Sequence, residues 1–357
     1  MTPRTLELPT ELRSFFDREG YLSVPAITTA EEVAWIRERL ERLFAERAGW
    51  EGGDMFDFAG TDEPELAERQ PQLLSPSKYD PALAGTQFRA NATALARHLL
   101  GPDAELVFEH AMLKPVGVAT PTPWHQDQAF YRAMTRYRSL TIWMPLQETP
   151  DEAGCLRFIP GSHRDRLLQH RSIGDDPRKH GLEAVDVDET GIVSCPLPAG
   201  GATVHHYLTL HSAGPNLVRK PRLAYALAFG VRSTLPVVWV DYPWNAEKQT
   251  ARDERERLAM RSSLSPKGIV RTALHLRRRA VRACGAVIRM AMGATRHRRA
   301  AQWFSMLGGG LWVSYQLLAE TEWGGVALFF GSTWGIPGAL WLTAAIFDWR
   351  DSRSEPA

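Results

Sequence analysis

Apolar residues in the first hundred positions of this chain recur with the 3.6-residue period of a helix. Residues 10–20 form a short helical segment that ends at Gly20, and residues 89–100 form a second one that ends at Gly101. Glycine favours the position just after a helix, because it adopts a left-handed backbone without strain. Both segments are therefore predicted to be helices.

A third helix is predicted between them. Thr29 and Glu32 have the spacing of a capping box, in which each side chain binds a free N–H of the first helical turn. The apolar face of this helix consists of Val33, Ile36, Leu40, Leu43 and Phe44. Residues 48–88 are rich in Gly, Asp and Pro and predict a loop across the surface.

From Glu105 onward the pattern changes to short strand-like runs, separated by Gly, Pro, Asp and Ser. No helical pattern long enough for a crossover between parallel strands interrupts them before residue 232. This spacing favours an antiparallel sandwich, and we expect a mainly β jelly roll flanked by the N-terminal helices. The predicted strands are Glu105–Lys114, Ser139–Leu146, Leu156–Ile159, Ala202–Leu210 and Leu223–Val231.

The chain changes character again after residue 245. Residues 267–299 carry ten Lys or Arg and no acidic residue. Two long uncharged runs follow, at 301–319 and 324–347, and tryptophans stand at their ends. Each run approaches the roughly 20 residues that a bilayer-spanning helix needs, and tryptophan favours the membrane interface.

These features predict a domain over 1–245, a charged linker or amphipathic helix over 246–300, a membrane hairpin over 301–348 and a polar tail over 349–357. The basic residues before and after the hairpin place both of its ends, and the first domain, in the cytoplasm. The basic stretch fits a surface of anionic lipid. The alternative is a pair of helices packed on the domain, in which case the protein is cytoplasmic.

Composition adds few constraints. The hydrophobic content of 44% and charged content of 23% are those of a globular protein, and a net charge of +1 argues against nucleic acid as a partner. The three cysteines are scattered without metal-ligand spacing, which is typical of reduced thiols in the cytosol. The N-terminus has no apolar segment of the kind found in secretion signals.

The candidate chemistry begins at His125 and Asp127. In an extended segment these two side chains point the same way, because strand side chains alternate faces. An imidazole and a carboxylate on one face supply two of the three ligands of a facial-triad iron(II) site. A third ligand is available at His211 or at His205, and strand parity does not choose between them.

Arg222 begins an apolar strand, where a buried guanidinium needs an anionic partner. Its fork matches the distal carboxylate of a dicarboxylic cosubstrate. Thr141 shares strand parity with Trp143 and is a candidate contact for the same cosubstrate, and Lys114 is a further candidate. Phe130, Tyr131 and residues 55–58 are candidates for a substrate pocket, with ordinary packing as the alternative.

Several motifs occur in the order found in one known family. Taken together they resemble the phytanoyl-CoA dioxygenase family of iron(II)- and 2-oxoglutarate-dependent oxygenases, from about Phe15 to Trp244. The motifs are Phe16–Tyr21, Trp124–Gln128, Leu140–Leu146, Ala153–His163, His211–Asn216 and Arg222.

This resemblance implies a double-stranded β-helix, or cupin-like fold, with iron held by His125, Asp127 and His211. It implies that Arg222 holds 2-oxoglutarate, with Gln126 and Trp143 lining the same pocket, and that O₂ is the oxidant. Many relatives carry a serine where this chain has Ala213. A hydrogen bond to the cosubstrate is therefore missing here, or Ser212 or Thr209 supplies it.

Relatives that halogenate lack the carboxylate that this chain has at Asp127, so the resemblance favours hydroxylation. The predicted protein is an oxygenase that hydroxylates a small organic or lipid-derived molecule, with release of succinate and CO₂. The alternative of another class is a non-catalytic, membrane-anchored binding module. The complete set of His125, Asp127, His211 and Arg222 counts against that alternative, because a binding module does not need all four.

Overall fold

The structure is a computed structural model that describes residues 9–63, 65–133, 138–231 and 240–262. The first compact unit extends to Ala259, beyond the predicted boundary at residue 245. The predicted hairpin at 301–348 and the basic stretch at 267–299 lie outside the described residues. Within the described part of the chain, no helix has the length and apolar character needed to cross a bilayer.

The three predicted N-terminal helices are present, as α1 (Thr10–Glu19), α2 (Ala30–Ala45) and α3 (Gln87–Leu100). The capping box forms only in part. The Thr29 hydroxyl accepts a hydrogen bond from Glu32 N, as predicted. The Glu32 carboxylate instead accepts from the backbone N–H groups of Gln87 and Phe88, and so it caps the start of α3.

A seven-stranded sheet carries most of the fold, and its described pairings are all antiparallel. We call it the large sheet. In spatial order its strands are β1 (Tyr21–Val24), β12 (Ala202–His206), β7 (Ser139–Pro145), β14 (Arg222–Val231), β4 (Ala104–Lys114), β3 (Pro71–Leu74) and β2 (Met55–Asp57).

The prediction of a surface loop over residues 48–88 was wrong, because β2 and β3 lie in that segment and extend the large sheet. One of the polar residues that suggested a loop instead forms hydrogen bonds within the segment. Asp57 is buried, and its carboxylate accepts from the backbone N–H groups of Ala59, Arg69 and Gln70. A buried turn of this kind has the composition of an exposed one.

A four-stranded sheet, the small sheet, faces the large one. Its strands in spatial order are β11 (Val193–Cys195), β8 (Leu156–Phe158), β13 (His211–Ala213) and β5 (Thr122–His125). The predicted strand over 202–210 ends early, at His206, because the chain turns there and passes from β12 in the large sheet to β13 in the small sheet. Two facing antiparallel sheets are what the jelly-roll prediction requires.

Two pairs of short strands and two short helices complete the described residues. β9 (His170–Ser172) pairs with β10 (Leu182–Ala184), and β6 (Arg132–Ala133) pairs with β15 (Val240–Asp241). The helices are α4 (Pro243–Ala246) and α5 (Ala251–Ser262). Short 3₁₀ helices lie at Pro76–Lys78, Pro81–Gly85, Asp127–Phe130, Asp151–Ala153, Ser162–Arg164 and Ile173–Asp175.

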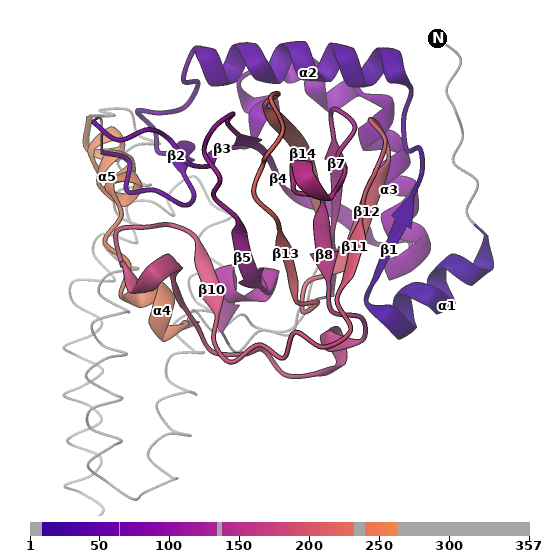
Figure 1. The fold of residues 1–357 in the computed structure, drawn as a ribbon. Coiled ribbons are helices and arrows are strands. Elements are labelled where there is room, and N and C mark those ends of the chain that lie inside the picture. The colour runs from indigo at the N-terminus through magenta and orange to yellow at the C-terminus, as the bar shows by residue number, and fades with distance from the viewer. Residues whose placement is uncertain (1–8, 64, 134–137, 232–239, 263–357) are drawn as a thin grey trace, which may run out of the picture. The chain divides into compact units, whose positions relative to one another are not determined.

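Helix α5 lies beside β2 (Figure 1). Arg252 donates to the carbonyl of Gly53 at 2.6 Å, and Arg255 donates to the carbonyl of Trp50 at 2.9 Å and to Asp62 at 2.8 Å. These bonds explain why the compact unit continues past residue 245.

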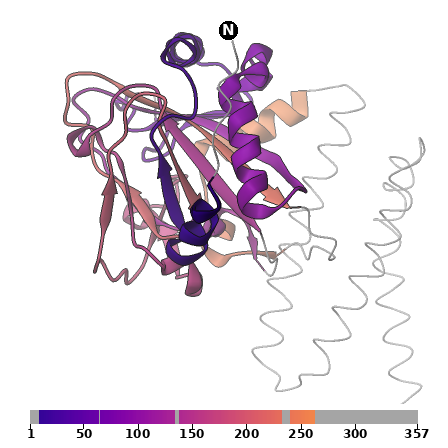
Figure 2. The same ribbon diagram turned by 90° about the vertical axis from the view of Figure 1, so that its right-hand side faces the viewer.

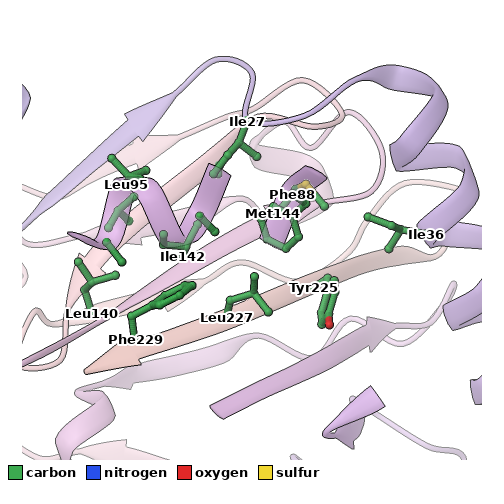
Figure 3. Packing of buried hydrophobic residues seen from close by; sticks show 14 of the residues in the cluster. Ile27, Ile36, Phe88, Leu95, Leu140, Ile142, Met144, Tyr225, Leu227 and Phe229 are labelled. Atoms are coloured by element: carbon green, nitrogen blue, oxygen red, sulfur yellow. The ribbon is translucent and has the colours of Figure 1, made fainter. Parts of the chain in front are cut away.

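The main hydrophobic core lies between the large sheet and the N-terminal helices. Helix α3 packs on β4, β14 and β7 (Figure 2), and α2 presents its predicted apolar face to the same core. Figure 3 shows the side chains at this interface, among them Ile36 from α2, Phe88 and Leu95 from α3, and Ile142, Leu227 and Phe229 from the sheet. Burial on this scale is the main source of stability in a fold of this size.

A second, smaller cluster lies between the two sheets. Trp143, Ala224 and Ala226 of the large sheet meet Leu156, Phe158 and Ala213 of the small sheet there. Strand β14 of the large sheet points only small or polar side chains into this space, whereas β1 and β7 contribute the aromatic Tyr21 and Trp143. The predicted site residues lie in this interior.

Candidate active site

Three side chains of the predicted iron site come together between the sheets. His125 ends β5, and His211 begins β13 directly opposite it in the pairing of these strands. Asp127 begins the 3₁₀ helix that follows β5. One ligand atom from each of the three residues lies within 4.8 Å of the others. The arrangement is a facial triad of two imidazoles and one carboxylate.

The backbone fixes the tautomer of both histidines. Nδ1 of His125 lies 2.8 Å from the carbonyl of Pro123, and Nδ1 of His211 lies 2.9 Å from the carbonyl of Thr209. A carbonyl oxygen only accepts, so each Nδ1 carries the proton and each Nε2 keeps its lone pair for a metal. Burial lowers the pKa of both imidazoles, which keeps them in the neutral, ligating form.

Two residues of the large sheet form hydrogen bonds with Asp127, which itself follows a strand of the small sheet. Its Oδ2 accepts from the hydroxyl of Thr141 at 2.6 Å and from Nε2 of His205 at 3.2 Å, while its Oδ1 lies 3.6 Å from Nε2 of His211. Burial by itself raises the pKa of this carboxyl, but the hydrogen bond from His205 and the neighbouring imidazoles lower it well below its usual value. Asp127 is therefore ionised, as a metal ligand must be.

The structure shows why strand parity did not choose between His205 and His211. The two residues lie on strands of different sheets, because the chain changes sheets between them. His211 lies beside His125 on the small sheet. His205 faces His211 from the large sheet, and the centroids of these two rings lie 4.1 Å apart. His205 is thus a hydrogen-bond donor to a ligand, a role that the sequence did not indicate.

Arg222 and Lys114 lie opposite each other on β14 and β4, at one end of the same interior. Both are fully buried, and within the described residues no carboxylate pairs with either. Lys114 is satisfied by backbone carbonyls, chiefly that of Gly214 at 2.7 Å. Among the described residues, Arg222 donates a hydrogen bond only to the carbonyl of Gly154, at 3.3 Å. Burial lowers the pKa of Arg222 to about 10, so it stays charged at neutral pH.

The guanidinium of Arg222 lies 5.3 Å from the ring of Trp143, which puts both predicted cosubstrate residues in one place. Within the described part of the chain, Nε of Arg222, Nε1 of Trp143 and Oγ1 of Thr203 are buried without a hydrogen-bond partner. Buried polar atoms are normally paired, so these donors mark a place for a polar ligand. A dicarboxylate such as 2-oxoglutarate, with one end at Arg222 and the other toward the triad, fits this donor set.

Two of the predicted cosubstrate residues have other contacts. Thr141 donates to Asp127, as described above. The Gln126 amide donates to the carbonyl of Leu208 and accepts from the N–H of Leu168, so it braces two loops around the site. Its own backbone N–H donates to Nε2 of His170. The contacts make Gln126 a support of the ligand segment, and its predicted contact with the cosubstrate stays a prediction.

The two substitutes considered for the serine absent at Ala213 do not face the interior. The hydroxyl of Thr209 donates to the carbonyl of Gly20 at 2.6 Å. Ser212 alternates with His211 and Ala213 along β13, and Ala213 belongs to the cluster between the sheets, so Ser212 points the other way. Thr203 is the buried hydroxyl that lies on the inner face beside Trp143.

An aromatic wall adjoins His125. The ring centroids of Phe58 and Phe130 lie 6.4 Å and 6.0 Å from that of His125, and the two phenylalanines lie 5.9 Å from each other. His180 stacks on Phe130 at 6.2 Å, and the Lys248 ammonium lies 5.2 Å from the centre of the same ring. Phe58 and Phe130 were predicted pocket residues, whereas His180 and Lys248 carry no recognisable sequence signal.

Comparisons with known proteins agree with this geometry. The chain is 30% identical to a protein of Stutzerimonas stutzeri described as a probable alpha-ketoglutarate-dependent hypophosphite dioxygenase. The aligned region of 213 residues covers 57% of this chain and 72% of that protein. The chain is also 28% identical to an ectoine dioxygenase of Sphingopyxis alaskensis over 180 residues, 50% of this chain and 56% of that protein.

Among solved structures, EvdO2 from Micromonospora carbonacea var. aurantiaca, in complex with 2-oxoglutarate, superposes with a TM-score of 0.56 at 34% identity, covering 68% of this chain and all of that one. The family model for phytanoyl-CoA dioxygenase (PhyH) matches residues 16–224, which include the whole triad and Arg222. The chain therefore belongs to the phytanoyl-CoA dioxygenase family of iron(II)- and 2-oxoglutarate-dependent dioxygenases.

Proposed function

We propose that this protein hydroxylates a C–H bond of a small organic molecule and couples this reaction to the conversion of 2-oxoglutarate and O₂ into succinate and CO₂. The observation that carries the proposal is the convergence of His125, Asp127 and His211 in one interior with a buried Arg222 that pairs with no carboxylate among the described residues. A binding module has no use for a preformed triad together with a dicarboxylate anchor.

The residues divide the work as follows. His125, Asp127 and His211 would hold iron(II) through two neutral imidazoles and one carboxylate, and Arg222 would bind the distal carboxylate of 2-oxoglutarate. Bound iron(II) and 2-oxoglutarate together supply the activation of O₂ and the oxidation of the substrate. Phe58 and Phe130 would keep water away from the His125 side of the triad.

The aromatic wall supports a substrate that carries an apolar carbon portion next to the metal. The half-buried Lys248 beside Phe130 favours an anionic group of the substrate at the far side of this wall. Burial lowers the pKa of Lys248 to about 7, and a bound anion would favour its charged form. Its described hydrogen bond goes to the carbonyl of His180, and within the described residues no carboxylate forms an ion pair with it. The substrate class that we propose is thus an organic anion with an apolar part, which includes lipid-derived acids.

The direct test is succinate formation by the purified full-length protein, loaded anaerobically with iron(II) and then given 2-oxoglutarate and O₂. We expect slow turnover that rises when an accepted organic acid is added, and we expect loss of turnover and of iron binding in Asp127→Ala. Succinate formation that is absent while iron is demonstrably bound would instead favour the non-catalytic binding module.

Candidate substrates are best tested as matched pairs, each an acid and its neutral amide. We expect the acids to stimulate succinate formation more than the amides, and Lys248→Met to remove most of that preference. Lys248→Arg, which keeps the charge, is the control. Equal stimulation by both members of each pair would show that Lys248 does not select the substrate.

We also propose membrane attachment through residues 301–348, on the basis of the two uncharged runs and the basic stretch before them. This would bring the catalytic domain close to lipid-derived substrates on the cytoplasmic side. Deletion of residues 301–357 should move the protein from the membrane pellet to the supernatant after fractionation. Unchanged sedimentation would argue against the hairpin as the anchor.

A further inference from the structure

The two carboxylate oxygens of Asp127 have different surroundings. Oδ2 receives two hydrogen bonds, from the Thr141 hydroxyl at 2.6 Å and from His205 at 3.2 Å. Oδ1 instead faces the triad and lies 3.6 Å from Nε2 of His211. One oxygen is thus engaged by the protein, and the other is directed to the metal position.

The direction of both hydrogen bonds follows from the acceptor. An ionised carboxylate only accepts, so Thr141 and Nε2 of His205 must both donate. His205 therefore carries its proton on Nε2, the atom that faces Asp127, and that nitrogen has no lone pair to offer a metal. The pairing separates His205 from the ligands although its ring lies against that of His211.

Rigid elements hold both donors. Thr141 on β7 and His205 on β12 are direct partners across two adjacent strands of the large sheet. Both residues are buried, and the ring of His205 is packed against His211 at 4.1 Å and Phe158 at 5.7 Å. Asp127, by contrast, lies just beyond a strand of the small sheet. The large sheet thus fixes the orientation of a ligand that the small sheet carries.

We propose that Thr141 and His205 are positioning residues that engage Oδ2 of Asp127 and so reserve Oδ1 as the single oxygen offered to the metal. This inference rests on the proposed function only for the identity of the metal. A carboxylate that used both oxygens would occupy an additional coordination position, which the cosubstrate and O₂ need. Thr141, predicted to touch 2-oxoglutarate, would act on it only through Asp127.

Four variants of the full-length protein separate this role from simple packing. Thr141→Val and His205→Phe keep the shape of the side chain and remove the donor, whereas Thr141→Ser and His205→Gln keep a donor. The readouts are the affinity for Co(II) and for iron(II) without O₂, and the visible absorption band that forms when 2-oxoglutarate chelates bound iron(II). Thermal denaturation of each variant checks folding.

We expect Thr141→Val and His205→Phe each to weaken metal affinity about 10-fold, the range seen when a hydrogen bond to a ligand is removed. The double variant should lose more than either single one and should also shift the 2-oxoglutarate band, because Oδ2 is then free. Thr141→Ser and His205→Gln should recover most of the affinity.

Wild-type metal affinity and an unshifted band in the folded double variant would overturn the proposal. Equal losses in the donor-keeping and donor-lacking variants would also overturn it, since packing would then be the cause. If the wild-type protein binds Co(II) but no 2-oxoglutarate, the proposed function fails, while the Co(II) affinities still decide the positioning role.

Discussion

The side chains of β14 alternate between large ones that face the helices and small ones that face the small sheet. On the helix side they are Leu223, Tyr225, Leu227 and Phe229, and on the inner side they follow Arg222 as Ala224, Ala226 and Ala228. The neighbouring strand β7 also divides its side chains between the two faces, with the aliphatic Ile142 and Met144 outside and the polar or polar-tipped Thr141 and Trp143 inside.

The difference between the two faces of the large sheet shows that one face stabilises the fold and the other carries the residues of the site. The outer face buries apolar area against α2 and α3, which stabilises the fold at about 25 cal/mol per Å². The inner face instead keeps a buried cation and several polar atoms for which the described residues supply no hydrogen-bond partner, an arrangement that costs stability until a ligand binds. Changes on the two faces should therefore have opposite effects on folding and on ligand binding.

The largest effect on stability is expected from Leu227→Ala on the outer face. Leu227 is fully buried, and its truncation leaves a cavity between the sheet and the helices, at a cost of about 2–5 kcal/mol. Urea denaturation measures the loss. Affinity of the folded variant for 2-oxoglutarate should stay within about 2-fold of wild type, and a large loss would mean that the two faces are coupled.

Arg222→Met on the inner face should show the reverse pattern. The affinity for 2-oxoglutarate should fall about 100-fold, because a charge-assisted, bidentate hydrogen bond is lost. The free energy of unfolding of the ligand-free protein should be unchanged or higher, since a buried guanidinium with one described carbonyl partner is costly. Isothermal titration and urea denaturation measure the two quantities. Unchanged affinity would mean that Arg222 is not the anchor.

The smallest effect concerns the support of the ligand segment and depends on pH. His170 is buried, its Nδ1 donates to the carbonyl of Leu168, and its Nε2 accepts from Gln126 N, so the fold requires the neutral ring. Burial lowers the pKa of His170 to about 4, with its hydrogen bond to Leu168 opposing this shift and the neighbouring His125 imidazole adding to it.

Because the folded pKa lies below the unfolded value of about 6.5, the folded state binds fewer protons, and stability falls as the pH drops from about 6.5 toward 4. At pH 5.5 protonation linked to His170 should lower the free energy of unfolding by about 1 kcal/mol. His170→Gln, which keeps an acceptor for Gln126 N, should show that much less loss between pH 7.5 and pH 5.5 in urea denaturation. An equal loss in both proteins would exclude His170 as a cause.

Much of the site could be predicted from local sequence. His125 and Asp127 stand two residues apart at a strand end, and Arg222 is a charge at the start of an apolar strand. The His-x-Asp pattern is weak by itself and gains weight from Arg222 and the motifs around it. The resemblance to one family chose His211 over His205. Residues without a local pattern were missed, among them His180 and Lys248, since nothing in the neighbouring sequence distinguishes a residue near the metal from one on the surface.

The sequence by itself determined the three N-terminal helices, the antiparallel character of residues 105–231 and two of the three ligands, His125 and Asp127, because each follows from periodicity or from residue type over a short stretch. Only the tertiary structure decided that β2 and β3 belong to the large sheet and that α5 belongs to the compact unit. It also showed that Thr141 and His205 both donate hydrogen bonds to Asp127. These facts depend on which strands become neighbours across a sandwich, and long-range pairing leaves no mark in the spacing of nearby residues.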